Sequence, residues 1–413
     1  MNARTSPSRK KQRAPPRKKA CNSCTRSKVR CDLERPACSR CRSRGQNCEY
    51  PANEGLSPSV ESTSSMIELD TTVLGIPRLD QITDAPVDFP FGAITAAQNQ
   101  PQTRPERDKE TEFDLQVVEL APSANAGDIR DRWLRPYVLP LTEGEEIPKA
   151  YHPFTLQYIA RILCTYPRCM QKDGGLPPII HRAQIVGREM PRALANCYSL
   201  VRMWEQAVPG SETMVVSIVE NEMRRLAEEP PSPYDYELLA AFQAYMIYSI
   251  MMYFTPIGGP SVLNDQAMMT LMEMAFRTAR NGLFCTAELS RSRPNWESWI
   301  VASTKRRAIL VMYLFSSVYN ADRLLPNFVA EELRGLYAPE SRSLWDAVDR
   351  ETWTKEYDRH LLDWEDGMLE ISELWRSVET SSPPRRRRIE RWVQTVDEFG
   401  MMIFAVCAHI HGC

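Results

Sequence analysis

The feature that most constrains the fold of this chain is a run of six regularly spaced cysteines in residues 21–48. The spacing is C-x2-C-x6-C, then six residues, then C-x2-C-x6-C again, so the two halves repeat each other. A segment this short has too few apolar residues for a core, so cross-links or bound metal must hold it together. The six residues are Cys21, Cys24, Cys31, Cys38, Cys41 and Cys48.

Three explanations compete for this spacing: a zinc site, a disulfide-bonded knot, and chance. Two matched half-repeats make chance negligible. Disulfide knots are typical of secreted chains, whereas Met1-Asn2-Ala3-Arg4 leads into a basic run without an apolar signal segment. Cys-x2-Cys pairs on short basic segments are typical of structural zinc, which thiolates hold in a tetrahedron. The sequence therefore favours zinc over disulfides.

Counting ligands predicts two zinc ions. One tetrahedral zinc needs four ligands and two would need eight, so six thiolates can serve two ions only when two of them bridge. Six thiolates and two Zn²⁺ leave two negative charges, which the neighbouring Arg and Lys side chains offset. Metal binding would then supply the folding free energy of the segment.

The cysteine spacing and the basic residues between the cysteines resemble the fungal-type binuclear zinc cluster of transcription regulators. The resemblance implies a small two-metal domain with two short helices related by a pseudo-twofold axis. Pro36 matches the family's proline in the loop between the halves, where a fixed φ shapes the turn. The implied ligand set is Cys21 and Cys38 as bridges, Cys24 and Cys31 for one metal, and Cys41 and Cys48 for the other.

Basic residues within the cysteine segment indicate DNA binding. A helix in residues 25–30 would point its N-terminal end into a major groove, as modules of this type do. Lys28 stands where the family's base-reading lysine stands, which implies contact with the guanines of a CGG-like triplet. Many members of the family have a basic residue directly after the second cysteine, where this chain has Thr25. The residues expected to contact the phosphate backbone are Arg26, Arg30, Arg40, Arg42 and Arg44.

The charge of the chain is strongly asymmetric. Residues 1–50 contain fifteen Lys and Arg against three Asp and Glu, a balance of +12. Because the whole chain carries −2, residues 51–413 carry −14. A basic head on an acidic body is typical of a nucleic-acid-binding arm, and the alternative is a solvated basic face without a partner.

Composition divides the chain into four regions. Residues 1–20 are expected to be a basic disordered arm, residues 21–48 the DNA-binding zinc cluster, residues 49–128 a flexible linker, and residues 129–413 an α-helical regulatory domain. No heptad repeat follows the cluster, so the sequence leaves open whether one copy or a homodimer binds DNA. The arm's two basic clusters, expected to act as a nuclear localisation signal, are Arg9, Lys10, Lys11 and Arg17, Lys18, Lys19.

Few strand signals follow residue 129, which predicts an all-α domain. Residues 151–170 are expected to be helical, with Phe154, Tyr158, Ile162 and, less regularly, Tyr166 at helical spacing. Three short segments resemble the helical regulatory region of many fungal factors, especially regulators of specialised-metabolite gene clusters. They are Ile162–Arg168, Leu176–His181 and Ser303–Arg307.

The uncharged segment Leu238–Phe254 has 17 residues, fewer than the roughly 20 that a membrane span usually needs. It is therefore predicted to be a buried core helix, and no membrane partner is expected. Ser343 is expected to open a helix as part of a capping box. A single final helix is expected over Arg385–His411, with a frayed tail at the chain end.

The sequence contains no P-loop, no Gly-rich dinucleotide motif and no nucleophile elbow, so an enzyme is not predicted. It predicts a nuclear, sequence-specific regulator of RNA polymerase II transcription that contains two Zn²⁺, binds double-stranded DNA, acts with the transcription machinery, and activates a biosynthetic gene cluster. The alternative is a zinc-containing interaction cofactor, or a repressor, that does not read DNA directly.

Overall fold

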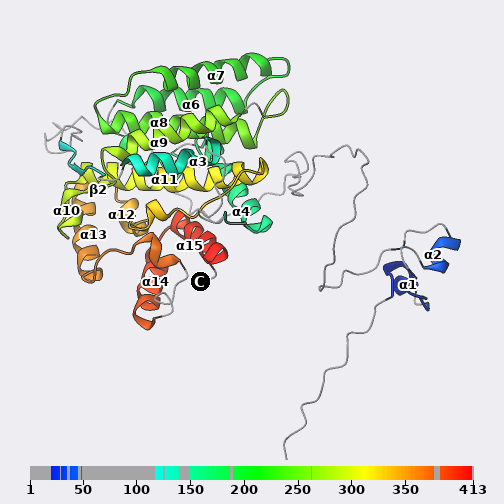
Figure 1. Cartoon of the computed structure of the whole chain (residues 1–413). Helices are drawn as coiled ribbons and strands as arrows, with labels where there is room; N and C mark the ends of the chain where they lie inside the picture. The colour runs from blue at the N-terminus through cyan, green and yellow to red at the C-terminus, as the bar shows by residue number, and fades with distance from the viewer. Residues whose placement is uncertain are drawn as a thin grey trace, which may run out of the picture. The chain divides into compact units, whose positions relative to one another are not determined.

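The computed structural model divides the chain into two compact units, residues 1–71 and residues 72–413 (Figure 1). The first unit contains α1 (Asn22–Arg26) and α2 (Ser39–Ser43). The described residues are 20–27, 29–34, 38–44, 48, 117–123, 126–138, 148–172, 174–186, 189–261, 263–375 and 382–411.

The core of the first unit is made of cysteine side chains. Cys21 and Cys38 each stand directly before a helix, with nearly the same backbone angles (φ −65°, ψ 156° and φ −63°, ψ 151°). The same backbone conformation before each short helix matches the repeated cysteine spacing. Four cysteines are buried, and Val29, Cys31 and Cys48 pack against them half-buried; the buried four are Cys21, Cys24, Cys38 and Cys41.

The described part of the second unit is mostly helical, as predicted. Its only described sheet pairs two short antiparallel strands. Its elements are β1 (Leu120–Ala121), α3 (Ala126–Val138), α4 (Pro153–Leu163), α5 (Thr165–Cys169), η4 (Arg182–Gln184), α6 (Arg192–Glu205), α7 (Glu212–Glu228), α8 (Asp235–Phe254), α9 (Asp265–Arg280), β2 (Phe284–Cys285), α10 (Thr286–Leu289), α11 (Trp296–Asp322), η5 (Glu331–Leu333), α12 (Arg342–Trp345), α13 (Arg350–Asp363), η6 (Ile371–Leu374), α14 (Pro383–Thr395) and α15 (Glu398–His411).

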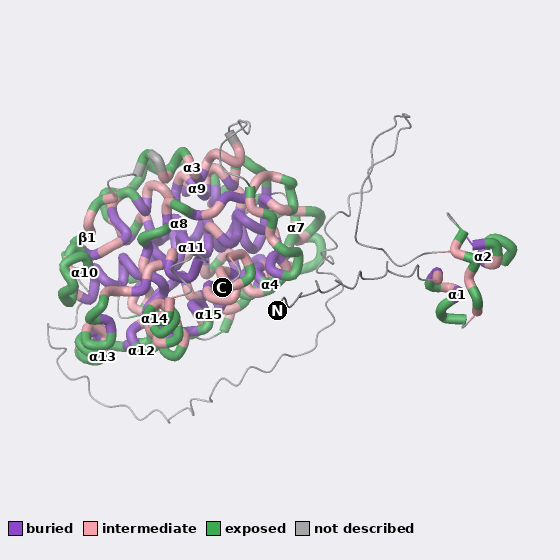
Figure 2. Tube along the Cα trace, turned by 60° about the horizontal axis from the view of Figure 1, so that its bottom comes forward, coloured by how far each residue is buried: buried purple, intermediate pink, exposed green. Residues whose placement is uncertain are grey.

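Two long helices, α8 and α11, form the centre of this unit. Figure 1 shows α7, α6, α8, α9 and α11 side by side, and Figure 2 shows α8 and α11 as largely buried. By length and composition alone α8 could cross a membrane, but 78% of its apolar window is buried inside the unit. Its polar Gln243 is fully buried, and its side-chain oxygen accepts from the Gln184 side-chain amide at 3.0 Å. The helix is thus apolar on all sides because neighbouring helices cover it.

Three consecutive cations in the middle of α11 are buried, although charged residues are rarely buried without partners. Lys305, Arg306 and Arg307 are 0%, 2% and 1% exposed. Each is paired with carboxylates from elements distant in the sequence, so α11 is tied to α8, to α10, to the segment before α12 and to the start of α15. The pairs are Lys305–Asp235, Arg306–Glu288, Arg306–Glu340 and Arg307–Asp397.

Part of the segment predicted as linker packs on the helical unit. Leu120 and Ala121 pair with Cys285 and Phe284 in an antiparallel ladder. The turn before β2 approaches this strand closely, because a Cβ on Gly282 would lie 2.3 Å from the carbonyl oxygen of Ala121. Gly282 also has a φ of 117°, which a residue with a Cβ rarely adopts.

Two predicted helix boundaries were wrong. The final helix is split into α14 and α15, because Val396 is extended and the Asp397 carboxylate accepts from the Gly400 N–H, which starts a new helix. The short helix α12 begins two residues earlier than predicted, since its cap is Ser341, whose hydroxyl accepts from the Leu344 N–H. Local periodicity does not distinguish one long helix from two that meet at a capping residue.

The helical structure predicted within residues 151–170 is confirmed by α4 and α5, and two of the aromatic residues at helical spacing lie on the exposed face of α4. Phe154 is 71% exposed and Tyr158 is 41% exposed. The buried face carries Leu156, Ile159 and Leu163 instead. Aromatic spacing therefore marked the outer side of this helix.

Candidate metal centre and nucleic-acid interface

The six cysteines of the first unit form two groups, each of four sulfur atoms close enough to hold one metal ion. Within each group all Sγ atoms lie within 4.8 Å of one another. Cys21 and Cys38 belong to both groups. The groups are Cys21, Cys24, Cys31, Cys38 and Cys21, Cys38, Cys41, Cys48.

The sulfur separations fit zinc and do not fit disulfides. Three of them are 3.9 Å (Cys21–Cys38), 3.9 Å (Cys21–Cys41) and 3.8 Å (Cys24–Cys38). Four sulfurs around a tetrahedral zinc at about 2.3 Å would be about 3.8 Å apart. A disulfide needs about 2.05 Å, and all six cysteines are free thiols. Thiolates in this arrangement would hold two zinc ions, which supply structural cross-links to a unit whose described residues have no other core.

Local backbone geometry brings the sulfurs together. The Cys-x2-Cys spacing places both cysteines on the first turn of a short helix, so that their side chains converge. The Cys24 N–H donates to Cys21 Sγ at 3.4 Å, and the Cys38 N–H donates to Cys48 Sγ at 3.2 Å. Such donors stabilise negative charge on sulfur.

Without a cation, burial and the neighbouring hydrogen bonds change the pKa values of these thiols in both directions. The side-chain hydrogen bond with Cys38, as the larger cause, and burial, as the second, raise the pKa of the Cys41 thiol to about 12. The backbone hydrogen bond from Cys41 lowers the pKa of Cys38. Thiolates are the metal-binding form, so a bound metal would have to displace protons from this cluster.

Asp32 joins the two half-repeats, a role that the sequence did not reveal. Its Oδ2 accepts from the Ser39 N–H at 3.0 Å and also from the Ser39 hydroxyl. These hydrogen bonds, with that from the hydroxyl foremost, lower the pKa of Asp32. Cys38 provides no side-chain cap for α2, so Asp32 takes that place. The only signal in the sequence is an acid directly after the third cysteine.

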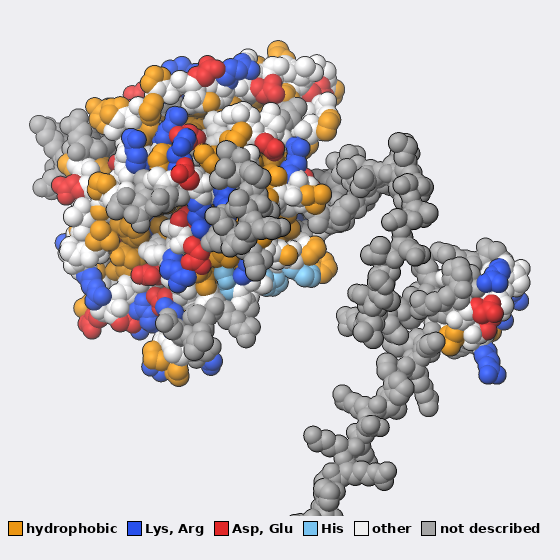
Figure 3. Space-filling view, in the orientation of Figure 1, with side chains coloured by type: hydrophobic (Ala, Val, Ile, Leu, Met, Phe, Trp, Pro, Cys, Tyr) orange, Lys and Arg blue, Asp and Glu red, His pale blue; other side chains and the backbone are white. Residues whose placement is uncertain are grey.

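Most of the predicted DNA contacts lie on the surface of this unit, where Figure 3 shows Lys and Arg side chains in blue. Arg26, Arg30, Arg42 and Arg44 are exposed and Arg40 is half-buried. Arg42 lies 3.8 Å from Glu34 in an exposed ion pair. Lys28 and Pro36 lie outside the described residues, as do the basic clusters Arg9, Lys10, Lys11 and Arg17, Lys18, Lys19.

The residues near the chain end do not form a metal site among the described residues. His409 hydrogen-bonds Thr155 at 3.0 Å, and His411 stacks on Trp375. Helix α15 continues to His411. The expected frayed tail is therefore replaced, as far as His411, by a helix packed through these contacts.

The chain was compared with protein families and with known proteins. Residues 19–56 match the fungal Zn(2)-Cys(6) binuclear cluster domain. The sorbicillinoid biosynthetic cluster transcription factor sor3 of Hypocrea jecorina is 51% identical over 39 residues, 9% of this chain and 6% of that protein. The aurofusarin biosynthesis regulatory protein aurR1 of Gibberella zeae is 38% identical over 80 residues, 19% and 17% of the two chains.

The similarity to a further relative covers most of the chain. The transcription factor gsfR2 of Penicillium aethiopicum is 21% identical over 375 residues, 82% of this chain and 83% of that protein. By contrast, the chain spans less than a fifth of sor3 and of aurR1. No solved structure matches the chain. Since the matched domain includes both four-cysteine groups and the alignment with gsfR2 runs well beyond them, the chain contains a fungal Zn(2)-Cys(6) binuclear cluster domain and is similar over most of its length to a transcription factor.

Proposed function

We propose that this chain is a nuclear activator of RNA polymerase II transcription that reads CGG-like triplets in the promoters of a biosynthetic gene cluster. The observation that carries the proposal is the pair of four-cysteine groups sharing Cys21 and Cys38. In this proposal all six cysteines are zinc ligands and the two shared cysteines bridge. The relatives support the pathway class, since sor3 and aurR1 are named as a biosynthetic cluster factor and a biosynthesis regulator.

In the proposed DNA complex, the zinc cluster supplies structure and the basic side chains make the contacts. Lys28 donates to guanine acceptors, which specifies sequence. The arginines neutralise phosphates and fix the position of the unit on DNA. The five backbone-contacting residues are Arg26, Arg30, Arg40, Arg42 and Arg44. The basic clusters in residues 9–19 direct the chain to the nucleus, and the chain binds as a monomer or a homodimer.

A reporter gene tests the direction of regulation. The full chain is expressed beside a reporter whose promoter contains CGG-like triplets, with scrambled triplets as the control. We expect output to rise with the intact chain on the CGG reporter alone, and to stay at background with Cys38→Ser. A fall in output would favour a repressor, and equal output from both promoters would favour a cofactor that does not read DNA.

A further inference from the structure

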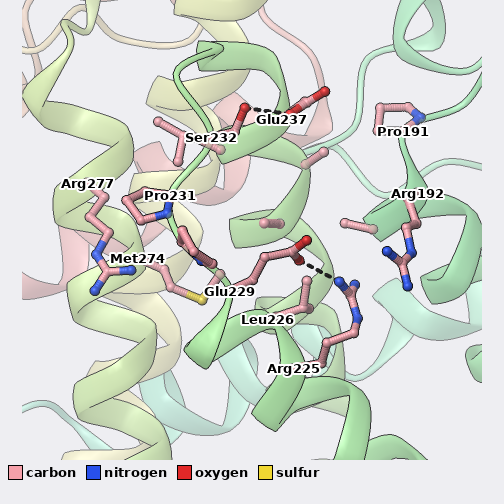
Figure 4. Close-up of a pocket in the computed structure, with 15 residues that line it drawn as sticks. Pro191, Arg192, Arg225, Leu226, Glu229, Pro231, Ser232, Glu237, Met274 and Arg277 are labelled. Carbon is pink, nitrogen blue, oxygen red and sulfur yellow. Dashed lines mark hydrogen bonds and ion pairs between the residues drawn. The ribbon is translucent and has the colours of Figure 1, made fainter.

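A cavity of about 300 Å³ opens where α6, α7, α8 and α9 meet. Figure 4 shows its lining, which comes from the start of α6, the end of α7, the connecting residues Pro230–Ser232, the first turns of α8 and the last turns of α9. Sites for small molecules in proteins have volumes of about 300–1,000 Å³. This cavity therefore has room for a small organic molecule.

The inner lining of the cavity is apolar. Ala193, Leu226, Ala240 and Met274 are buried residues that line it. Alanine side chains from α6 and α8 leave the space that larger residues would fill. Such a lining favours the apolar body of a ligand, because contact removes its surface from water.

Two arginines lie on the rim of the cavity, and neither has an ion pair shorter than 3.7 Å with a described residue. Arg192 has no ion pair with a described residue. Arg277 has a long ion pair with Glu273, with 3.7 Å between its Nε and the carboxylate oxygen. Figure 4 shows Arg192 and Arg277 on opposite sides of the cavity. Their guanidinium groups are suited to bind a carboxylate with two hydrogen bonds.

The remaining charges of the rim are already engaged. Arg225 pairs with Glu222 at 2.7 Å and with Glu229 at 2.5 Å. The Glu237 carboxylate accepts from the Ser232 hydroxyl at 2.5 Å. The first turn of α6 also lacks a side-chain cap, which adds to the positive potential beside Arg192.

We propose that this cavity binds a small organic carboxylate, with its apolar body on the alanine and leucine lining and its anionic group at Arg192 or Arg277. The ligand would bridge four helices of the regulatory domain and would stabilise their arrangement in proportion to its occupancy. This inference goes beyond the reading of DNA and does not depend on it, because every lining residue lies in the helical unit.

Calorimetry on the full chain tests the proposal with carboxylates and their neutral amides. The probes are naphthoate with naphthamide and octanoate with octanamide. We expect each carboxylate to bind at least about tenfold more tightly than its amide, since charge-assisted contacts are the stronger ones. Of the variants Arg192→Gln and Arg277→Gln, the one that removes the arginine holding the carboxylate should lose most of this preference. Arg202→Gln and Arg280→Gln, exposed arginines on the same two helices, should leave it unchanged.

A second variant tests the location independently of charge. Ala241→Leu adds a larger side chain at a half-buried lining position and should weaken the binding of acids and amides alike. Circular dichroism confirms that each variant is folded before binding is measured. Carboxylates that bind no more tightly than amides would overturn the proposal. So would a carboxylate preference that survives in both arginine variants, or binding that Ala241→Leu leaves unchanged.

Discussion

The Sγ atoms of Cys21 and Cys38 lie 3.9 Å apart, and these two cysteines belong to both four-cysteine groups. They occupy the same position in the two half-repeats, directly before α1 and before α2. The metal centre and the internal repeat are therefore one feature, because each half contributes one shared sulfur and two of its own.

Loss of a shared cysteine should affect both metal sites. Cys38→Ser is expected to reduce zinc by more than one ion per chain and to unfold the small unit, since metal binding supplies its folding free energy. Elemental analysis of the purified full chain gives the zinc content. Cys285→Ser, a buried cysteine of the helical unit, is the control and should retain two zinc ions. One fully occupied zinc in Cys38→Ser would argue against bridging.

Lys28 and Arg42 should affect DNA binding in different ways. Lys28→Ala is expected to abolish discrimination between CGG-like and altered triplets, with two zinc ions still bound, because a good base contact provides about 1–3 kcal/mol of discrimination. Arg42→Ala should weaken the binding of all duplexes equally. It should also reduce the salt dependence of the affinity by about one phosphate contact. Titrations with matched and altered duplexes at several salt concentrations check both. Unchanged discrimination in Lys28→Ala would show that another residue reads the bases.

Arg306 should be essential to the stability of the helical unit. It is 2% exposed and pairs with Glu288 at 3.0 Å and with Glu340. Arg306→Met would leave two buried carboxylates without their cation, which should lower the free energy of unfolding by about 3–5 kcal/mol. Lys355→Met, which breaks an exposed pair with Glu351, should lower the free energy of unfolding far less, because solvent screens exposed pairs. Urea unfolding followed by circular dichroism measures both, and equal losses would refute the role of Arg306.

His181 should make the helical unit less stable in acid. Its Nδ1 accepts from the Ala183 N–H at 3.1 Å, and its Nε2 lies 2.9 Å from the Trp345 carbonyl oxygen, which can only accept. Both contacts need a neutral ring with its proton on Nε2. Burial foremost, and nearby Arg307 as well, lower the pKa of His181 from 6.5 to about 4.

The sign of this effect follows from proton uptake. Below pH 6.5 the unfolded chain binds a proton at His181 that the folded chain refuses until about pH 4, so stability falls as the pH falls through this window. The loss attributable to this residue should be about 3 kcal/mol by pH 4. His181→Gln should make the pH dependence less steep, whereas His152→Gln, at an exposed histidine, should not. Unfolding curves between pH 7 and pH 4 give the free energy of unfolding of each variant. An equally steep pH dependence in both variants would rule out His181 as a cause.

Patterns that are local in the sequence predicted the fold well. The cysteine repeat predicted a two-metal cluster, and α8 was identified as a core helix from its apolar composition and its length. Lys305, Arg306 and Arg307 behave differently, because a cationic run gives no sign that it is buried. Their burial depends on acids far away in the chain, and Asp397 is 90 residues from Arg307. Asp397 likewise splits the predicted final helix through its cap, a contact that periodicity does not contain.

The candidate site shows the same limit on a smaller scale. Spacing grouped the cysteines, but the bond from Ser39 to Asp32 depends on the path of the chain between the two halves. The cavity between α6, α7, α8 and α9 has no signature in the sequence either, because its rim residues Arg192 and Arg277 come from separate helices. Contacts between distant segments are set by tertiary packing, and they decide which charges are neutralised.

Selection of duplexes from a random pool most directly tests whether the zinc-bound chain reads CGG-like triplets in DNA. The full chain carrying two zinc ions is incubated with the pool, and a second sample is first treated with a chelator. We expect enrichment of CGG-like triplets with the zinc-loaded chain and none after chelation, since the cluster holds the base-reading segment in place. A zinc-loaded chain that enriches no sequence, or enrichment that survives removal of zinc, would contradict this account.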